Sequence, residues 1–335
     1  MIYLDTASIG LPPRPVVEAV RADLERWAAG EARAPSYDAP VDAARASYAR
    51  LLGVPVERVA IGSQVSAMAG LIATALEPRA RVLCAEEDFT SVLFPFLARD
   101  LDVVLVPLAE IPEAIDGATA LVAVSAVQSA GGRVANLDAI AAAARHHDAL
   151  TFVDATQATG WLPLDGSRFD AVATATYKWL TSPRGATLTT VSESLLGRMQ
   201  PSAAGWYAGD DRWEALYGAP LRLPATARRL DVSPAWSCWV GTAASLAIFE
   251  ERTIRAVNSH DVGLANALRA QLGLEPSNSA MVSLPIDEAT AQRLRDAGVV
   301  AAMRAGRLRV GFHLHNTTDD VDAVATLLGK GPRSA

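Results

Sequence analysis

A lysine and an aspartate, each placed after an apolar run, are the side chains of this sequence best suited to chemistry. Asp154 ends the run 150–153, which predicts a buried strand, and Lys178 follows a second apolar stretch at 171–173. A lysine amine can form a Schiff base with an aldehyde, and a carboxylate can keep a pyridine nitrogen protonated so that the ring accepts electrons. The pair, 24 positions apart, therefore predicts a site for pyridoxal 5'-phosphate (PLP).

The rarity of lysine in this chain favours a special role for Lys178. Most lysines are solvated surface residues, but this chain has only two and otherwise uses arginine. To hold an aldehyde and to move a proton as a general base, the Lys178 amine needs a pKa well below the ordinary value of about 10.4. Lys178 is thus the predicted catalytic residue.

The composition describes a globular protein with room for two domains. The chain has 335 residues, of which 50% are hydrophobic and 20% charged. Its net charge of −7 argues against nucleic acid or an anionic membrane as a partner. Cys84 and Cys238 have neither ligand nor redox spacing, so no metal site is expected. Without a signal-peptide pattern or a spanning apolar stretch, a cytoplasmic protein is expected.

Strand and helix patterns alternate along most of the chain, which predicts an α/β fold with a doubly wound, mostly parallel sheet. Strands are expected at 58–61, 81–85, 103–107, 120–125, 150–154 and 171–173, and helices at 15–29, 41–52, 67–76 and 137–146. Residues 197–229, rich in Gly, Pro and aromatic residues, break this rhythm and predict an excursion near the site or a dimer interface. A long helix at 238–257 then leads to a second unit, with strands at 281–285 and 308–312 and helices at 288–297 and 318–328.

The turn Gly62–Ser66 joins a predicted strand to a predicted helix. Its backbone N–H groups, its hydroxyls and the helix N-terminus are groups that bind phosphate. Such a turn often only caps its helix, so the turn alone is a weak signal.

Together with segments near both ends of the chain, these residues resemble the class V aminotransferase family within the fold type I PLP enzymes. The two segments are residues 3–7, Tyr-Leu-Asp-Thr-Ala, and residues 309–317, which begin with Arg309 and close with Asn-Thr. The family includes cysteine desulfurases, kynureninases, isopenicillin-epimerase-like proteins and the C–S lyase of ergothioneine synthesis. The resemblance implies a large PLP-binding domain at 12–245 and a smaller α+β domain formed by 1–11 with 246–330.

The resemblance also implies roles for particular residues. Phe89 would stack on the ring, Asp154 would bind the ring nitrogen and Gln157 the ring hydroxyl. Arg309 would bind the substrate carboxylate, and Ser8 would line the substrate site. The phosphate would be bound by Ser63, Gln64, Val65 and Tyr177, with Val65 offering only its main chain. Thr242, at the start of the long helix, would reach the phosphate of a neighbouring subunit, which implies a homodimer with shared active sites. The aromatic residues Trp206, Tyr207, Trp236 and Trp239 would wall the substrate pocket, or pack at an interface or in the core.

Several reactions fit these residues. A persulfide-forming desulfurase needs a cysteine on the loop before the Arg309 strand, and residues 297–303 contain none. The leading hypothesis is a β-eliminating C–S lyase that acts on an amino acid through a quinonoid. An aminotransferase or an epimerase is the alternative, and a catalytically silent PLP-binding protein is a more distant one. A nucleotide-binding dehydrogenase lacks its G-x-G-x-x-G turn.

Overall fold

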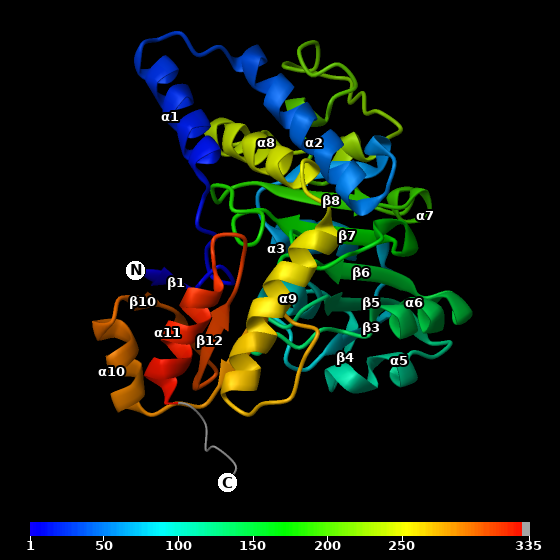
Figure 1. The fold of residues 1–335 in the computed structure, drawn as a ribbon. Coiled ribbons are helices and arrows are strands. Elements are labelled where there is room, and N and C mark those ends of the chain that lie inside the picture. The colour runs from blue at the N-terminus through cyan, green and yellow to red at the C-terminus, as the bar shows by residue number, and fades with distance from the viewer. Residues whose placement is uncertain (330–335) are drawn as a thin grey trace.

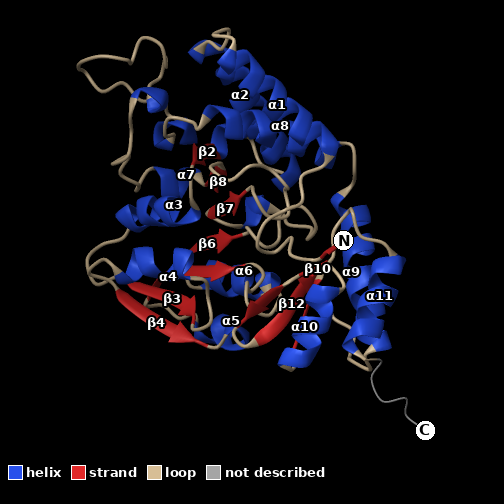
Figure 2. Ribbon diagram, turned by 90° about the vertical axis from the view of Figure 1, so that its left-hand side faces the viewer, coloured by secondary structure: helices blue, strands red, loops and turns tan. Residues whose placement is uncertain are grey.

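A seven-stranded sheet forms the centre of the protein in the computed structural model, which describes residues 1–329. The strand order is β2-β8-β7-β6-β5-β3-β4 (Figures 1 and 2). The strands are β2 (Val59–Gly62), β3 (Arg81–Ala85), β4 (Asp102–Val106), β5 (Thr119–Ser125), β6 (Leu150–Asp154), β7 (Ala171–Ala175) and β8 (Thr187–Val191). β8 runs antiparallel to both of its neighbours, β2 and β7, and the other neighbouring strands pair in parallel. The prediction of a mostly parallel α/β sheet is confirmed.

Helices cover both faces of this sheet, because alternate side chains of its strands point to opposite faces. One apolar core joins the sheet to α3 (Val65–Ile72) and α4 (Thr90–Leu97). On the other face lie α2 (Asp38–Leu52), α5 (Ile111–Ala114) and α6 (Leu137–His146). Next to α2, the helix α8 (Trp236–Glu250) packs between α2 and α1 (Arg14–Ala28) (Figure 1).

Strand β8 was missed in the sequence because three of its five residues are threonines. Thr187, Thr189 and Thr190 are nevertheless fully buried. Threonine is branched at its β-carbon and packs on a pleated surface much as valine does. A search for apolar runs passes over such a strand.

The prediction of a single helix at 238–257 is wrong, since two helices occupy this region. α8 ends at Glu250 and α9 (Ile254–Gln271) begins after Thr253, whose side chain accepts a hydrogen bond from the Ala256 N–H. This cap satisfies an orphan donor of the new helix and fixes its start. The chain changes direction here and passes from the α8 layer towards the smaller unit (Figure 1).

The smaller unit has an apolar core of its own, which includes Leu4, Leu268, Val310 and Phe312. Its antiparallel sheet has the order β11-β12-β9, and β1 pairs with β10 in parallel. The elements are β1 (Ile2–Tyr3), β9 (Met281–Leu284), β10 (Val299–Val300), β11 (Ala302–Arg304), β12 (Arg307–Gly311), α10 (Glu288–Asp296) and α11 (Thr318–Leu328). We propose the two domains as 12–245 and 1–11 with 246–330; residue 330 lies outside the described residues.

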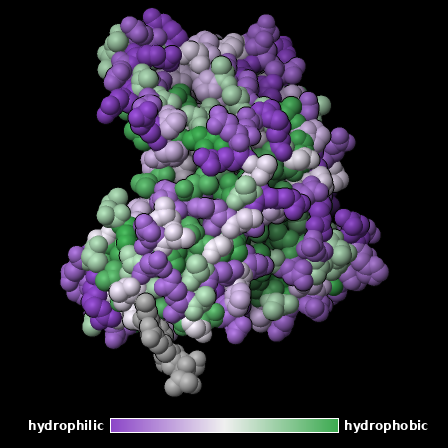
Figure 3. Space-filling view, in the orientation of Figure 1, coloured by the Kyte–Doolittle hydropathy of each residue, from purple (hydrophilic) through white to green (hydrophobic). Residues whose placement is uncertain are grey.

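The excursion at 197–229 lies against α2 (Figures 1 and 2). Arg212 pairs with Asp42 at 2.7 Å, and the Tyr207 hydroxyl donates to Asp38 at 2.9 Å. No helix within residues 1–329 combines the length and apolar character that crossing a membrane requires. Figure 3 shows hydrophobic residues at the surface between α1 and β1, while hydrophilic residues predominate on the helices above.

Candidate active site

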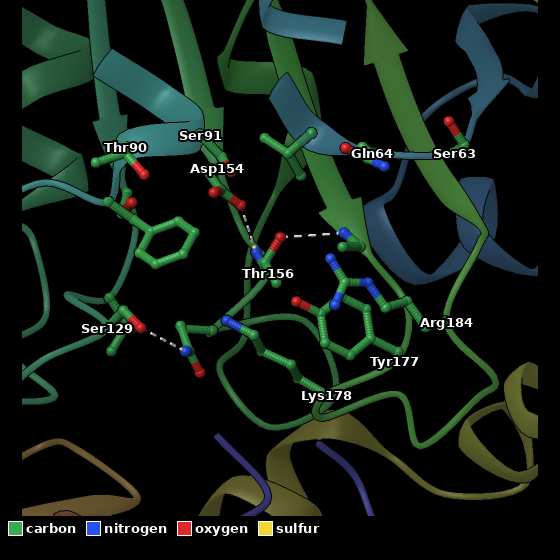
Figure 4. A pocket seen from close by; sticks show the side chains of 16 residues that line it. Ser63, Gln64, Thr90, Ser91, Ser129, Asp154, Thr156, Tyr177, Lys178 and Arg184 are labelled. Atoms are coloured by element: carbon green, nitrogen blue, oxygen red, sulfur yellow. Dashed lines mark hydrogen bonds between the residues drawn. The ribbon is translucent and has the colours of Figure 1, made fainter. Parts of the chain in front are cut away.

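A cavity of ≈ 310 Å³ opens where β5, β6 and β7 end. The carboxyl ends of parallel strands are the usual place for a ligand in an open α/β sheet. Figure 4 shows side chains from several loops pointing into this space. The lining residues are Ser63, Gln64, Val65, Phe89, Thr90, Ser91, Ser125, Val127, Ser129, Asp154, Thr156, Gln157, Ala175, Tyr177, Lys178 and Arg184.

Asp154, the last residue of β6, is held by the turn that follows it. Its Oδ1 accepts a hydrogen bond from the Thr156 N–H at 2.8 Å, and the Thr156 hydroxyl accepts one from the Ala175 N–H (Figure 4). Burial raises the pKa of Asp154, while the bonds from Thr156 and the charge of Lys178 oppose that rise. A buried carboxylate in this position favours a cationic partner such as a protonated ring nitrogen.

Lys178 follows β7 in a tight turn that Gly10 helps to fix. The Gly10 N–H donates to the carbonyl of Tyr177, and a side chain at residue 10 would place its Cβ 2.0 Å from the carbonyl oxygen of Lys178. Lys178 is only 7% exposed. Burial lowers its pKa to about 8, with Asp154 opposing and Arg309 among the cations that add to the shift. The amine is thus partly neutral near physiological pH.

Phe89 and Tyr177 both lie close to the Lys178 amine. The Nζ atom lies 5.4 Å from the Phe89 ring centroid and 5.9 Å from that of Tyr177. Phe89 is the N-cap residue of α4 and is 47% exposed. An aromatic ring with a free face beside the amine is suited to stacking on a flat heterocycle.

Gln157 lines the cavity with its amide already engaged. Nε2 donates to Ala7 O at 2.9 Å and to Ser129 Oγ at 3.0 Å, and Oε1 accepts from Trp179 Nε1 at 2.8 Å. Both amide hydrogens are therefore used. The predicted bond from Gln157 to a ring hydroxyl requires one of these partners, such as Ser129, to be exchanged.

The predicted anion-binding turn reaches the cavity from its other side. β2 ends at Gly62, and Ser63 and Gln64 lead into α3, which begins at Val65. The first N–H groups of a helix have no partner within it and face outwards with a partial positive charge. These groups and the Tyr177 ring form the phosphate-binding candidate.

Arg309 lies directly behind the cavity wall rather than in it. It is 1% exposed, and its guanidinium donates to Ser129 O at 2.5 Å and to Ser8 Oγ at 2.6 Å, with Asp5 Oδ1 at 3.4 Å. Burial lowers the pKa of Arg309, and Asp5 opposes this. Ser129 belongs to both the arginine cluster and the cavity lining, so the predicted residues Ser8 and Arg309 adjoin the other site residues through it.

Thr242 does not line the cavity of its own subunit. The residue lies within α8 and is fully buried, and its hydroxyl contacts Cys238 O at 2.8 Å and Ser182 Oγ at 3.2 Å. The predicted contact is with the phosphate of a neighbouring subunit, so Thr242 as a cofactor-binding residue stays a prediction.

The excursion and its aromatic residues pack within the chain, and their predicted contribution to a pocket or interface shared by two subunits stays a prediction. No residue of 197–229 lines the cavity, and neither do Trp236 and Trp239. Tyr207 and Trp239 are buried, and Trp236 stacks on Tyr37 with ring centroids 5.0 Å apart. Conversely, sequence reasoning missed Thr90, Ser91, Thr156 and Arg184, because nothing in their local patterns separates them from ordinary loop residues.

The donor set of the cavity fits PLP. It offers an amine of lowered pKa for the aldehyde, a buried carboxylate for the ring nitrogen, an aromatic face for the ring and a helix N-terminus for the phosphate. Lys178 and Asp154 both line this one cavity, as their sequence pattern requires.

Known proteins resemble the chain along most of its length. It is 27% identical over 304 residues to the uncharacterized aminotransferase YcbU of Bacillus subtilis (strain 168), covering 83% of this chain and 80% of that protein. It is 25% identical over 335 residues to isopenicillin N epimerase of Streptomyces clavuligerus, covering 85% and 83%. Among solved structures, the cystine C–S lyase C-DES in complex with its product cysteine persulfide superposes with a TM-score of 0.85 at 19% identity, covering 98% of each chain.

The family to which these relatives point is matched directly by the sequence. The description of that family is Aminotransferase class-V, and the match covers residues 2–293, nearly the whole chain. This protein belongs to the class V aminotransferase family and is a PLP-dependent enzyme.

Proposed function

We propose that the enzyme is a β-eliminating lyase that cleaves a C–S bond in a small amino acid without help from a protein thiol. The observation that carries this proposal is the chemistry of the cavity lining: it contains one amine of lowered pKa, Lys178, and no cysteine. One base beside the cofactor is enough to remove an α-proton, and elimination needs no second nucleophile.

The two cysteines are poorly suited to a sulfur relay. Cys84 is buried in β3, and burial, with help from Asp88, raises the pKa of its thiol to about 12. Cys238 donates to Arg184 O at 3.1 Å, and burial raises its pKa too. Since the thiolate is the reactive form, neither residue is poised to accept sulfur.

In this proposal the chain's own residues bind the substrate and move one proton. When bound through Lys178, PLP supplies an electron-accepting ring that weakens the bonds of the substrate α-carbon. Asp154 keeps the ring nitrogen protonated. Ser129 and Arg309 bind the α-carboxylate, Arg309 by exchanging its present acceptors for it. The Lys178 amine then takes the α-proton.

The products follow from the balance of atoms. The α-proton goes to the base, and the Cβ–S bond breaks with its electron pair leaving on sulfur, which takes up a proton. The released enamine gains a proton at Cβ from the solvent to become an imine, which water hydrolyses. Each turnover therefore yields a 2-keto acid, ammonia and a thiol, sulfide or persulfide, according to the substrate. C-DES, which has the same fold, is described with cysteine persulfide as its product.

An epimerase or an aminotransferase is the second candidate, because relatives of 25% and 27% identity bear these names. Both reactions also begin with the loss of the α-proton to a base, and Lys178 is suited to all three. An epimerase has to return a proton to the opposite face of the α-carbon. Apart from Lys178, the titratable side chains that line the cavity are those of Asp154, Tyr177 and Arg184. None of these is a second free amine or imidazole.

A product screen separates these reactions. The PLP-loaded enzyme is incubated with L-cysteine, L-cystine and other β-substituted amino acids, and 2-keto acid, ammonia, sulfide and the D-amino acid are measured. The lyase proposal predicts 2-keto acid and ammonia in equal amounts without any added keto acid, and Lys178→Ala is the matched control. Keto acid that appears only with an amino acceptor present, or a D-amino acid formed without ammonia, would contradict the proposal.

We also propose that the enzyme works as a homodimer that associates through the exposed face of α1. A surface pocket of ≈ 590 Å³ along this helix is lined by apolar side chains, including Val17 and Leu24, which are 46% and 45% exposed. Arg184 lines both this pocket and the cavity, so a second subunit would lie close to the site. Light scattering should give a dimer mass for the native chain and for Arg14→Ala, and a monomer mass for the Val17→Asp/Leu24→Asp variant. A monomeric native chain would reject this arrangement.

A further inference from the structure

We propose that Arg184 binds the phosphate of PLP and supplies the cation of that subsite. The inference rests on PLP being the cofactor and not on which reaction the enzyme catalyses. Arg184 lines the cavity together with Ser63, Gln64 and Tyr177. In Figure 4 its guanidinium lies over the Tyr177 ring and points towards the turn that carries Gln64, and its central carbon is 5.2 Å from the ring centroid.

The backbone of Arg184 is held against α8, while the residue as a whole is exposed. The carbonyl of Arg184 accepts a hydrogen bond from Cys238 Sγ. Gly185 has φ +131°, and a Cβ there would lie 2.9 Å from that sulfur. Pro183 packs on Gly241, where an added Cβ would lie 2.5 Å from the proline ring. These close contacts hold the turn and leave the side chain at residue 184 directed along the cavity.

The guanidinium has no acceptor of its own in residues 1–329. Neither a hydrogen bond nor an ion pair links the Arg184 side chain to another of these residues, and its ring contact with Tyr177 is one that arginine makes while its edge donors remain free. A guanidinium with free donors beside a helix N-terminus is suited to a phosphate group.

The phosphate subsite otherwise lacks charge. A phosphate monoester carries nearly two negative charges at neutral pH, whereas the α3 N-terminus supplies about half a positive charge. Val65 has no hydroxyl, and the hydroxyl predicted to come from Thr242 of the partner subunit would carry no charge. Lys178 is committed to the aldehyde of the cofactor. Among the residues that line the cavity, Arg184 is therefore the one cation left for the phosphate.

Equilibrium binding to the apo-protein tests this role without any turnover. PLP and pyridoxal, which lacks the phosphate, are titrated into the native chain, Arg184→Ala and Arg184→Lys while the absorbance of the bound aldehyde is followed. Losing a charge-assisted hydrogen bond should raise the Kd for PLP by about 10- to 100-fold. The Kd for pyridoxal should change by less than about twofold. The Kd of Arg184→Lys for PLP should lie between those of the native chain and Arg184→Ala, because lysine keeps the charge but not the fork of donors.

Arg222→Ala, an exposed arginine of the excursion outside the cavity lining, is the matched control and should leave both Kd values unchanged. Inorganic phosphate provides a second readout: it should compete with PLP more weakly for Arg184→Ala than for the native chain. An unchanged Kd for PLP, or an equal loss for PLP and pyridoxal, would overturn the proposal. An effect on substrate KM alone would assign Arg184 to the substrate instead, and would overturn it as well. If the native enzyme failed the lyase assay while Arg184→Ala still lost affinity for PLP and not for pyridoxal, the proposed reaction would be rejected. The assignment of Arg184 to the phosphate would then stand.

Discussion

His313 Nε2 lies 2.8 Å from the main-chain oxygen of Trp179, the residue that follows Lys178. On its other side, His313 Nδ1 lies 2.8 Å from Asp261 Oδ2. His313 and Asp261 are fully buried. His313, which follows β12, thus connects Asp261 of α9 to the turn that presents Lys178.

Replacing His313 by alanine should destabilise the protein by about 3–5 kcal/mol, because it opens a cavity at a fully buried position and removes the contacts with Asp261 and the Trp179 carbonyl. Urea unfolding of the apo-protein measures the loss. His146→Ala, at the exposed end of α6, should cost less than about 1 kcal/mol. Equal losses in the two variants would show that the buried pair does not stabilise the lysine turn.

The depressed pKa of Lys178 predicts that this residue destabilises the apo-protein at neutral pH. The ammonium is disfavoured in the fold, with a pKa of about 8 against 10.5 for the ordinary side chain. The unfolded chain therefore binds the proton more tightly, and this cost is fully present below about pH 8. It is relieved as the pH rises from 8 towards 10.5.

Lys178→Met, which keeps the volume without the charge, should accordingly be more stable than the native apo-protein at pH 7. The difference should shrink by pH 10. Urea unfolding of both proteins at several pH values measures it. A gain in stability that stays constant between pH 7 and pH 10 would contradict a lowered pKa. PLP added to this variant should give no aldimine absorbance, because the only amine lining the cavity is gone.

Arg45 and Asp231 form a buried ion pair behind the anion-binding turn. Arg45 Nη2 lies 2.6 Å from Asp231 Oδ2, and Oδ1 of the same carboxylate accepts from the Ile61 N–H at 2.9 Å. Asp231→Ala should destabilise the protein by about 3–5 kcal/mol, since it leaves a buried guanidinium and a strand N–H without their partner.

The exposed pair Arg50–Glu250, also between a helix and a distant segment, provides the comparison for Asp231. Glu250→Ala should cost no more than about 1 kcal/mol. Thermal or urea unfolding of the two variants measures both effects. If Asp231→Ala and Glu250→Ala lowered the free energy of unfolding by equally small amounts, burial would not explain the stabilisation by the Arg45–Asp231 pair.

Elements that are buried and apolar could be predicted from the local sequence pattern. The runs 81–85 and 150–154 predicted β3 and β6 with their observed bounds, because strands covered on both faces are apolar throughout. β8 was not predicted because its buried threonines cannot be told from exposed polar residues in a sequence. The break between α8 and α9 escaped because Thr253 acts through a cap within an otherwise helical pattern. Neither β8 nor the break between α8 and α9 could be predicted from its place in the chain.

The candidate site, too, could be predicted only where its residues stand out in the local sequence. Lys178 and Asp154 stood out because their residue types and flanking strands are unusual together. Arg184 is one arginine among many, and only the fold places it beside the turn of Ser63. The prediction for Thr242 rests on resemblance and concerns a neighbouring subunit, so the fold of one chain leaves it a prediction.

A chain without cysteine should retain the proposed lyase activity. Cys84→Ala with Cys238→Ser removes both thiols; the serine keeps a donor for Arg184 O, and alanine is compatible with the buried β3 position at the cost of a small cavity. Because neither thiol lines the cavity, kcat for β-elimination should stay within about threefold of the native value, while a persulfide relay would lose nearly all activity. Intact-mass spectrometry of the native enzyme during turnover should likewise find no added sulfur. A folded, PLP-loaded double variant that is inactive, or a native chain heavier by one sulfur atom, would instead assign a cysteine to the reaction.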